Sequence, residues 1–289
     1  MLERKLVPGR QSLDESEARL WPVVHPNELG RSEPISICWS PIVACNLHCP
    51  HCLDDKTVAQ GASDLRVHIA QLIGRTKILG VDISGGEPLL VPELPRLLEH
   101  LVGAGLVVSI TTNGWWLERR APELDGKVDA VRVSLDGPDA MSHDRWRGKG
   151  SFARAISGLR LAIKLAIPVQ VQTVAMRSTV SRLQEVVNVA AAEGANGVTI
   201  LQMLPIGEGV ALASQELLSD LEVEDVVAQI TASDLHVRLR KRESAAGFTV
   251  VRADGSIWRN QDDAMSIGRR RFLMAPGDLL LLNELDGSA

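Results

Sequence analysis

The decisive stretch of this chain reads Cys45-Asn46-Leu47-His48-Cys49-Pro50-His51-Cys52. It places three thiols within eight residues, in the spacing C-x3-C-x2-C. Thiolates are the usual protein ligands of iron–sulfur clusters, so three of them on one loop can hold three irons of a [4Fe–4S] cluster. The fourth iron would then lack a ligand from this loop and could bind another molecule.

A zinc site is the main alternative for the same residues. The three cysteines together with His48 or His51 would make a tetrahedral ligand set. Zinc sites more often use C-x2-C pairs, however, and the sequence has no second pair downstream. A disulfide framework is less favoured still, because the chain is long, has four cysteines and shows no secretory leader.

The composition favours a globular α/β protein. The 289 residues are 45% hydrophobic, which suits one large domain with an appendage, and no apolar run reaches the roughly 18 residues of a membrane span. A net charge of −5 gives no basic field for nucleic acid. We therefore expect a cytoplasmic protein with neither nucleic acid nor membrane as a partner.

Short β-branched runs alternate with segments of helical apolar spacing. Strands are predicted over 35–39, 81–84, 106–112, 130–135, 168–175 and 197–203, and helices over 65–79, 91–104, 152–166 and 183–193. This alternation indicates βαβ units and a parallel sheet with right-handed crossovers. In such sheets functional residues gather beyond the carboxyl ends of the strands.

The pattern changes at both ends of this region. Residues 1–33 are polar and irregular and are predicted to form an arm, which leaves 34–209 as the core and 210–289 as a small α+β extension. In the extension we predict a helix over 216–230, a strand over 235–240 and an apolar stripe over 279–282. A hairpin of 248–252 and 256–259 is predicted around Ala253-Asp254-Gly255.

A second motif, Gly85-Gly86-Glu87-Pro88, directly follows the predicted strand 81–84. Two glycines let the backbone approach a ligand closely, and the proline restricts the chain. Alone, the motif could be only a strand-to-helix turn. Together with the cysteine run one βα unit earlier, it resembles the radical S-adenosylmethionine (radical SAM) enzymes, whose signature is C-x3-C-x-φ-C with φ usually aromatic. His51 occupies φ here.

The resemblance implies a fold, two cofactors and a reaction. The fold is a partial (β/α)6 TIM-like barrel of parallel strands. One [4Fe–4S] cluster is held by Cys45, Cys49 and Cys52, and S-adenosyl-L-methionine (AdoMet) chelates the open iron. An electron from the cluster then cleaves AdoMet to methionine and a 5′-deoxyadenosyl radical. A flavodoxin or ferredoxin is the implied reducing partner.

The resemblance also implies contacts to AdoMet at successive strand ends. Glu87 is a natural partner of the amino group, Arg147 of the carboxylate, and His51 packs near the adenine. Asn113 and Asp136 could instead make Asx turns that cap the next helix. The implied AdoMet-binding residues are His51, Gly85, Gly86, Glu87, Pro88, Asn113, Ser134, Asp136, Arg147, Gln172 and Leu201, and the implied catalytic residues are the cluster ligands Cys45, Cys49 and Cys52.

The string Ser134-Leu135-Asp136-Gly137-Pro138 with the downstream His143-Asp144 and Arg147-Gly148 is similar to one branch of these enzymes. That branch modifies peptides and peptide-derived cofactors and carries auxiliary clusters in a C-terminal SPASM or twitch domain. Because this chain has no cysteine after Cys52, we expect a shortened extension without auxiliary clusters.

The implied function is hydrogen abstraction from a peptide or peptide-derived natural product. The chain has no Tyr, and Cys38 is predicted to be a packing residue, so hydrogen donors are scarce. We therefore expect bond formation or desaturation. The alternatives are a small-molecule enzyme (a dehydratase, decarboxylase or mutase of a sugar, nucleoside or amino acid), an epimerase that uses Cys38, and a non-catalytic scaffold.

Overall fold

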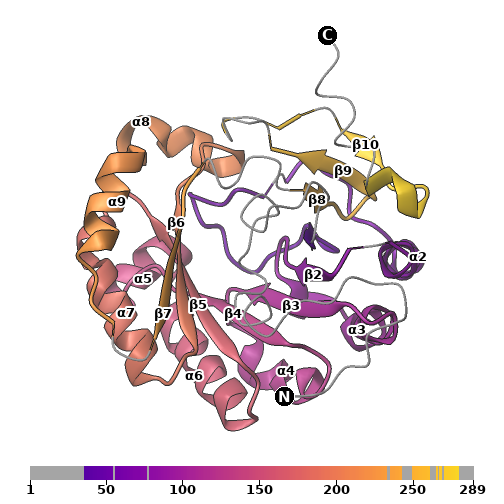
Figure 1. Ribbon diagram of the computed structural model, residues 1–289, viewed down its shortest axis with the longest axis horizontal. Helices are drawn as coiled ribbons and strands as arrows, with labels where there is room; N and C mark the ends of the chain where they lie inside the picture. Colours follow the sequence, from indigo (N-terminus) through magenta and orange to yellow (C-terminus); the bar gives the residue numbers. More distant parts are fainter. Residues whose placement is uncertain are drawn as a thin grey trace.

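The computed structural model describes residues 36–54, 56–76, 78–232, 235–242, 249–260, 265, 267–268 and 270–279. Within them the strands form a ten-stranded sheet in the order β10-β9-β8-β1-β2-β3-β4-β5-β6-β7. The sheet curves around a central space, and most of the helices lie on its outer side (Figure 1). This arrangement confirms the α/β partial barrel.

All six predicted core strands are present, and their ends differ from the prediction by no more than one residue. They are β1 Ser36–Trp39, β2 Gly80–Ile83, β3 Val107–Thr112, β4 Ala130–Ser134, β5 Val169–Ala175 and β6 Gly197–Gln202. Each is parallel to the next. Parallel pairing needs a crossover between strands, and helices supply these crossovers.

The helices of the core and of the following segment are α2 Ser63–Gly74, α3 Leu94–Gly103, α4 Leu117–Leu124, α5 Ala140–Arg147, α6 Ser151–Lys164, α7 Leu183–Ala192, α8 Ala213–Glu216 and α9 Asp220–Ala228. Short 3-10 turns cover Pro88–Leu90, Val180–Arg182, Gly207–Leu212 and Pro276–Leu279. The first helix ends earlier than predicted, and the Thr76 hydroxyl donates to the Ile73 carbonyl at this end (2.6 Å).

The outer faces of the strands pack under the helices, whereas the inner faces are partly polar. Val81 and Ile83 of β2 are fully buried in the apolar core. Asp82, between them, points to the opposite side, because side chains alternate along a strand. Its neighbours in register are Cys38 of β1 and Ser109 of β3. The interior of the barrel is therefore lined by groups that can recognise a ligand.

The C-terminal segment extends this same sheet. Strand β7 (His236–Arg240) is parallel to β6, and β8 (Thr249–Val251) is parallel to β1, with Val250 in register with Cys38. The predicted hairpin is confirmed: β8 and β9 (Ser256–Arg259) are antiparallel, and β10 (Arg271–Phe272) follows. The arm over 1–33 lies outside the described residues, and the division into three parts stays a prediction.

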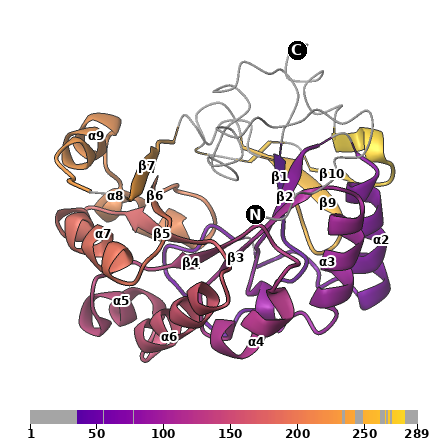
Figure 2. The same cartoon turned by 60° about the horizontal axis from the view of Figure 1, so that its bottom comes forward.

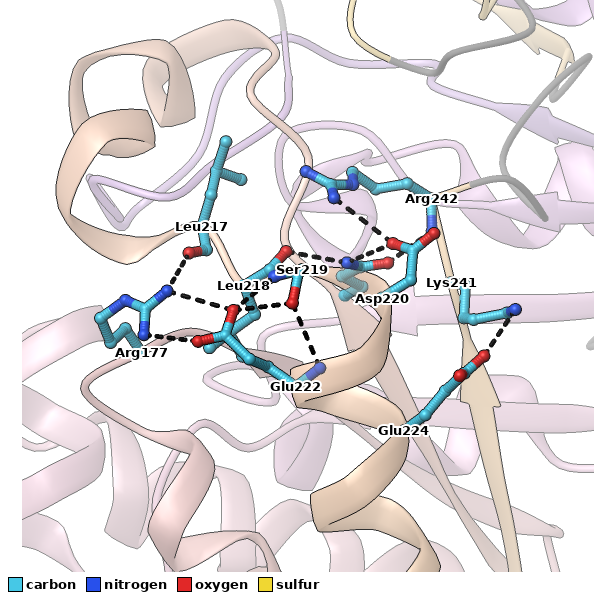
Figure 3. A network of polar contacts seen from close by, with 10 residues as sticks. Arg177, Leu217, Leu218, Ser219, Asp220, Glu222, Glu224, Lys241 and Arg242 are labelled. Carbon is cyan, nitrogen blue, oxygen red and sulfur yellow. Dashed lines mark hydrogen bonds and ion pairs between the residues drawn. The ribbon is translucent and has the colours of Figure 1, made fainter.

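A network of polar contacts fixes α9 against the strand ends (Figure 3). Ser219 and Glu222 form a capping box at the start of α9, which satisfies its first backbone donors. Contacts to neighbouring segments join Arg177 to Glu222 (2.8 Å), Gln202 to Asp220 (2.9 Å) and Lys241 to Glu224 (2.6 Å). These contacts hold the segment around β6 and β7 at the edge of the barrel. Figure 2 shows the same barrel turned by 60°. Among the described helices, none is both long and apolar enough to cross a bilayer.

Candidate functional site

A cavity opens at the carboxyl ends of the parallel strands. It gathers eleven of the predicted site residues on its wall, namely Cys45, Cys49, His51, Cys52, Gly85, Gly86, Asn113, Ser134, Arg147, Gln172 and Leu201. These residues come from the six parallel strands β1 to β6 or from the segments that follow them, with Gln172 in the middle of β5 and Arg147 at the end of α5. The remaining three, Glu87, Pro88 and Asp136, do not line this cavity.

The cysteine loop follows β1 and turns its three half-buried thiols to this cavity. The Cys52 amide donates to the Cys49 carbonyl (3.1 Å), which closes the loop. The Leu47 amide (3.4 Å) and the Asn113 side-chain amide (3.7 Å) donate to the sulfur of Cys45. Burial raises the pKa of Cys49 to about 11 as a free thiol, and a metal would displace its proton. Soft sulfur ligands with N–H donors fit an iron–sulfur cluster.

The two glycines of the second motif are required by the loop itself. A β-carbon on Gly85 would lie 2.0 Å from the Ser40 hydroxyl, and one on Gly86 would lie 2.2 Å from the Ala44 carbonyl oxygen. Gly85 also has a positive φ of 102°. The Gly86 amide donates to the Ile42 carbonyl (2.9 Å). The glycines therefore let the end of β2 pack directly against the start of the cysteine loop.

Glu87 lies behind the cavity wall and not on it. Its carboxylate is fully buried and accepts hydrogen bonds from the Thr112 hydroxyl (2.7 Å) and from the amides of Asn113 (2.9 Å) and Leu89 (3.0 Å). Burial raises the pKa of this carboxyl, although the three donors oppose the shift. Glu87 thus accepts from three protein donors, and its contact with an AdoMet amino group stays a prediction. Pro88 is likewise buried, as the first residue of a 3-10 turn.

Asp136 is also buried and does not line the cavity. Its buried carboxylate contacts Arg147 Nε (2.5 Å) and His51 Nε2 (2.9 Å) and accepts from the Val174 amide (2.9 Å). Burial opposes the charge, but Arg147 and His51 hold the pKa of this carboxyl well below its usual range. Asp136 therefore joins the cysteine loop, α5 and β5, and it orients two groups that do line the cavity.

Arg147 and His51 are placed by this contact. Burial opposes the charge on Arg147, yet Asp136 keeps its pKa above the ordinary value. The His51 ring packs edge-on against Trp146, with ring centres 5.8 Å apart. Its Nδ1 atom is buried and has no hydrogen-bond partner among the described residues. Protein contacts therefore hold both side chains at the cavity wall.

Asn113 makes the Asx turn that the sequence left open and also lines the cavity, while its contact with AdoMet stays a prediction. Its side-chain oxygen accepts from the Trp115 amide (2.9 Å), which is an Asx turn, while its amide group donates to Asn46 (3.1 Å) beside the cavity. Ser134 ends β4 as a buried residue on the cavity wall. Gln172 accepts from Arg132 (3.4 Å) and so faces the barrel interior, as expected.

Several cavity residues were missed by the sequence analysis. Asp82 and Arg132 line the interior and approach each other at 3.5 Å, and they lay inside strands that were predicted only as strands. Val250 and Trp258 reach the cavity from the C-terminal hairpin, where they pack with Cys38. A period-two reading of polar residues within each strand would have found the first pair. The second pair depends on a strand pairing between distant segments.

Residues 39–190, more than half of the chain, match the sequence profile of the Radical SAM superfamily. The AdoMet-dependent heme synthase of Methanosarcina barkeri is 31% identical over 186 residues, which cover 61% of this chain and 52% of that protein. The mycofactocin maturase MftC of Mycobacterium tuberculosis is 31% identical over 191 residues, which cover 63% of this chain and 48% of that protein. This chain therefore spans about half the length of these relatives.

The fold is similar to that of SuiB from Streptococcus suis, solved with S-adenosylmethionine and also with its precursor peptide SuiA. The AdoMet-bound structure has a TM-score of 0.65 and 16% identity, and the match covers 78% of this chain and 60% of SuiB. Radical SAM enzymes bind a [4Fe–4S] cluster and AdoMet, and the thiol loop and the cavity beside it fit both. This chain belongs to the radical SAM superfamily.

Proposed function

We propose that this radical SAM enzyme takes a hydrogen atom from a peptide or a peptide-derived natural product. The observation that carries the proposal is the convergence of Cys45, Cys49 and Cys52 with Asn113 and Arg147 on one cavity. The branch that the downstream motif resembles acts on peptides, and MftC and SuiB support the same choice.

The residues of the cavity divide into three tasks. Cys45, Cys49 and Cys52 would hold the cluster, and Arg147 would bind the carboxylate of AdoMet, since a guanidinium matches a carboxylate in two hydrogen bonds. When bound, the cluster and AdoMet supply a carbon radical strong enough to break a substrate C–H bond. The tasks of Asn113, Ser134, Gln172 and Leu201 would be to orient AdoMet.

The substrate would enter at the side of the cavity formed by the hairpin. This side is lined by Val250 of β8 and Trp258 of β9. An external one-electron donor such as a flavodoxin or ferredoxin would reduce the cluster. A reducing compartment such as the cytoplasm suits thiols that must stay available for iron.

Mass spectrometry after anaerobic reconstitution tests the proposal. Short peptides encoded beside the gene should raise the yield of 5′-deoxyadenosine and should themselves change in mass or stereochemistry. The Arg147→Gln variant should retain its iron and lose this response, because the substitution removes the proposed carboxylate contact. A response confined to sugars, nucleosides or free amino acids would instead establish the small-molecule alternative, which the heme synthase similarity keeps open.

The fate of the substrate radical is the second open choice. The sequence favours bond formation or desaturation, because hydrogen donors are scarce. That expectation treats Cys38 as a packing residue. Cys38 does pack against Ile206, Val250 and Trp258, but it also lines the cavity. This position favours the alternative in which a hydrogen atom is returned to the substrate, as in an epimerase.

A further inference from the structure

The thiol of Cys38 lies inside the same cavity as the cluster loop. Cys38 is in the middle of β1, in register with Asp82 on one side and with Val250 on the other. Its sulfur is 2.8 Å from the hydroxyl oxygen of Ser84, the residue before Gly85. The thiol is therefore buried from bulk solvent, yet it is on the wall of the space where a substrate would lie.

Two further polar atoms on this wall indicate that the space receives a ligand. The hydroxyl of Ser40, two residues beyond Cys38, is 1% exposed and has no hydrogen-bond partner in the described part of the chain. The buried Nδ1 atom of His51 likewise has no hydrogen-bond partner among the described residues. Buried polar groups are nearly always paired in native proteins, so each exception needs an explanation. A bound molecule in the cavity explains both.

The environment keeps Cys38 in the protonated form. Burial and the nearby carboxylate of Asp82 raise the pKa of this thiol to about 12. A thiol is the most readily oxidised hydrogen-bearing group of ordinary side chains apart from tyrosine, and the chain contains no Tyr. The other three cysteines of the chain are the proposed cluster ligands. Cys38 is thus the remaining thiol of this enzyme.

We propose that Cys38 donates a hydrogen atom to carbon radicals in the cavity. The inference rests on the proposed radical function. The S–H bond breaks homolytically, its hydrogen forms a new C–H bond at the radical carbon, and sulfur is left as a thiyl radical. One electron from the external low-potential reductant and one proton from water, passed through the Ser84 hydroxyl, then restore the thiol. The substrate thus ends with as many hydrogens as it began with. The expected product differs from the substrate in the configuration of the reacting carbon.

The test needs no knowledge of the substrate. The reconstituted enzyme is incubated with AdoMet in deuterium oxide, with titanium(III) as the reductant and without added thiols. The carbon radical from AdoMet should then take deuterium from Cys38, so that 5′-deoxyadenosine gains a mass unit. In Cys38→Ser, which keeps a hydrogen-bonding group beside Ser84, the product should remain unlabelled, because an O–H bond is much stronger than an S–H bond.

Two measurements separate this inference from the proposed function. The iron content and the AdoMet dissociation constant of Cys38→Ser should equal those of the wild type. The infrared S–H band of the wild-type holoenzyme belongs to Cys38 alone, and it should shift to the S–D position in deuterium oxide and be absent from Cys38→Ser. Unlabelled 5′-deoxyadenosine from the wild type, label that persists in Cys38→Ser, or an S–H band that does not shift would each overturn the role of Cys38. Absence of 5′-deoxyadenosine altogether would instead overturn the radical function.

Discussion

Asp54 and Arg252 form a buried ion pair that ties the exit of the cysteine loop to the C-terminal hairpin. Asp54 is two residues after Cys52, and Arg252 directly follows β8. The two residues are 4% and 1% exposed. The guanidinium contacts the Asp54 carboxylate and lies 5.8 Å from the ring centre of Trp258. The hairpin side of the cavity is thus anchored to the segment that carries the three cysteines.

Breaking this pair should strongly destabilise the fold. Arg252→Met leaves the Asp54 carboxylate buried, with Lys56 as its remaining cation among the described residues, and removing one partner of a buried pair lowers the free energy of unfolding by about 3–5 kcal/mol. Urea unfolding of the variant measures the change. Arg160→Met is the matched control, because Arg160 pairs with Glu193 at the surface and its loss should change the unfolding free energy far less. Equal effects of the two substitutions would show that the Asp54–Arg252 contact does not anchor the hairpin.

His143 should make the protein less stable in acid. Burial lowers the pKa of this imidazole from 6.5 to about 4, and its Nδ1 atom accepts from the Asp136 amide (3.1 Å), which requires the neutral ring. Between these pH values the unfolded chain binds a proton that the folded protein does not. The free energy of unfolding should therefore fall by about 1.4 kcal/mol per pH unit as the pH drops from 6.5 to 4.

His143→Gln isolates this contribution, because its side-chain oxygen can still accept from the Asp136 amide but does not titrate. Its unfolding free energy should vary less steeply with pH over the same interval. Parallel pH profiles for the variant and the wild type would show that His143 is not held neutral by the fold.

Asp136→Asn should weaken AdoMet binding without loss of the cluster. The substitution removes the charge that orients Arg147 and His51, although neither is a cluster ligand. We expect the AdoMet dissociation constant to rise about tenfold or more, which corresponds to about 1.4 kcal/mol. Equilibrium dialysis measures it, with iron content as the check. Asp139→Asn, at the N-cap of α5, should leave the constant unchanged. An unaltered constant in Asp136→Asn would remove Arg147 from the AdoMet site.

Glu87→Gln should act mainly on stability. The NH2 group that replaces one carboxylate oxygen would face protein donors. A buried donor left unpaired lowers the free energy of unfolding by about 1–3 kcal/mol. Urea unfolding should show this loss, and AdoMet affinity should fall only through displacement of Asn113. Glu118→Gln, an exposed change in α4, is the control. A large loss of AdoMet affinity at unchanged stability would instead return Glu87 to the amino-group contact that its motif implies.

The core strands could be predicted from the sequence because each is a short β-branched run between helical segments. Within the core, the helices α4 and α5 were missed for local reasons. Pro122 lies inside α4, where a proline argues against a helix, and α5 has no apolar stripe, since its sequence is Ala-Met-Ser-His-Asp-Arg-Trp-Arg. The membership of β7 and β8 in the barrel sheet could not be predicted. Strand β7 pairs with β6 across a helical segment, and β8 pairs with β1, which is far away in the sequence.

In the candidate site, too, local motifs could be predicted from the sequence, whereas contacts between distant segments could not. Cys45, Gly85 and Arg147 could be found because they belong to short motifs that keep their spacing. The contacts of Glu87 and Asp136 could not be predicted in this way, because a carboxylate in a motif is equally able to face a ligand or protein donors. Only the arrangement of distant segments decides which donors it meets, as the contact between Asp136 and the Val174 amide shows.

Reductive cleavage of AdoMet tests the central claim most directly. The reconstituted protein should hold about four irons and four sulfides per chain, and on reduction it should release methionine and 5′-deoxyadenosine in equal amounts. Replacing Cys45, Cys49 and Cys52 together by Ala should abolish both the iron and the cleavage, whereas Cys38→Ala should retain them. A full cluster that leaves AdoMet intact, or cleavage that persists in the triple variant, would contradict the account.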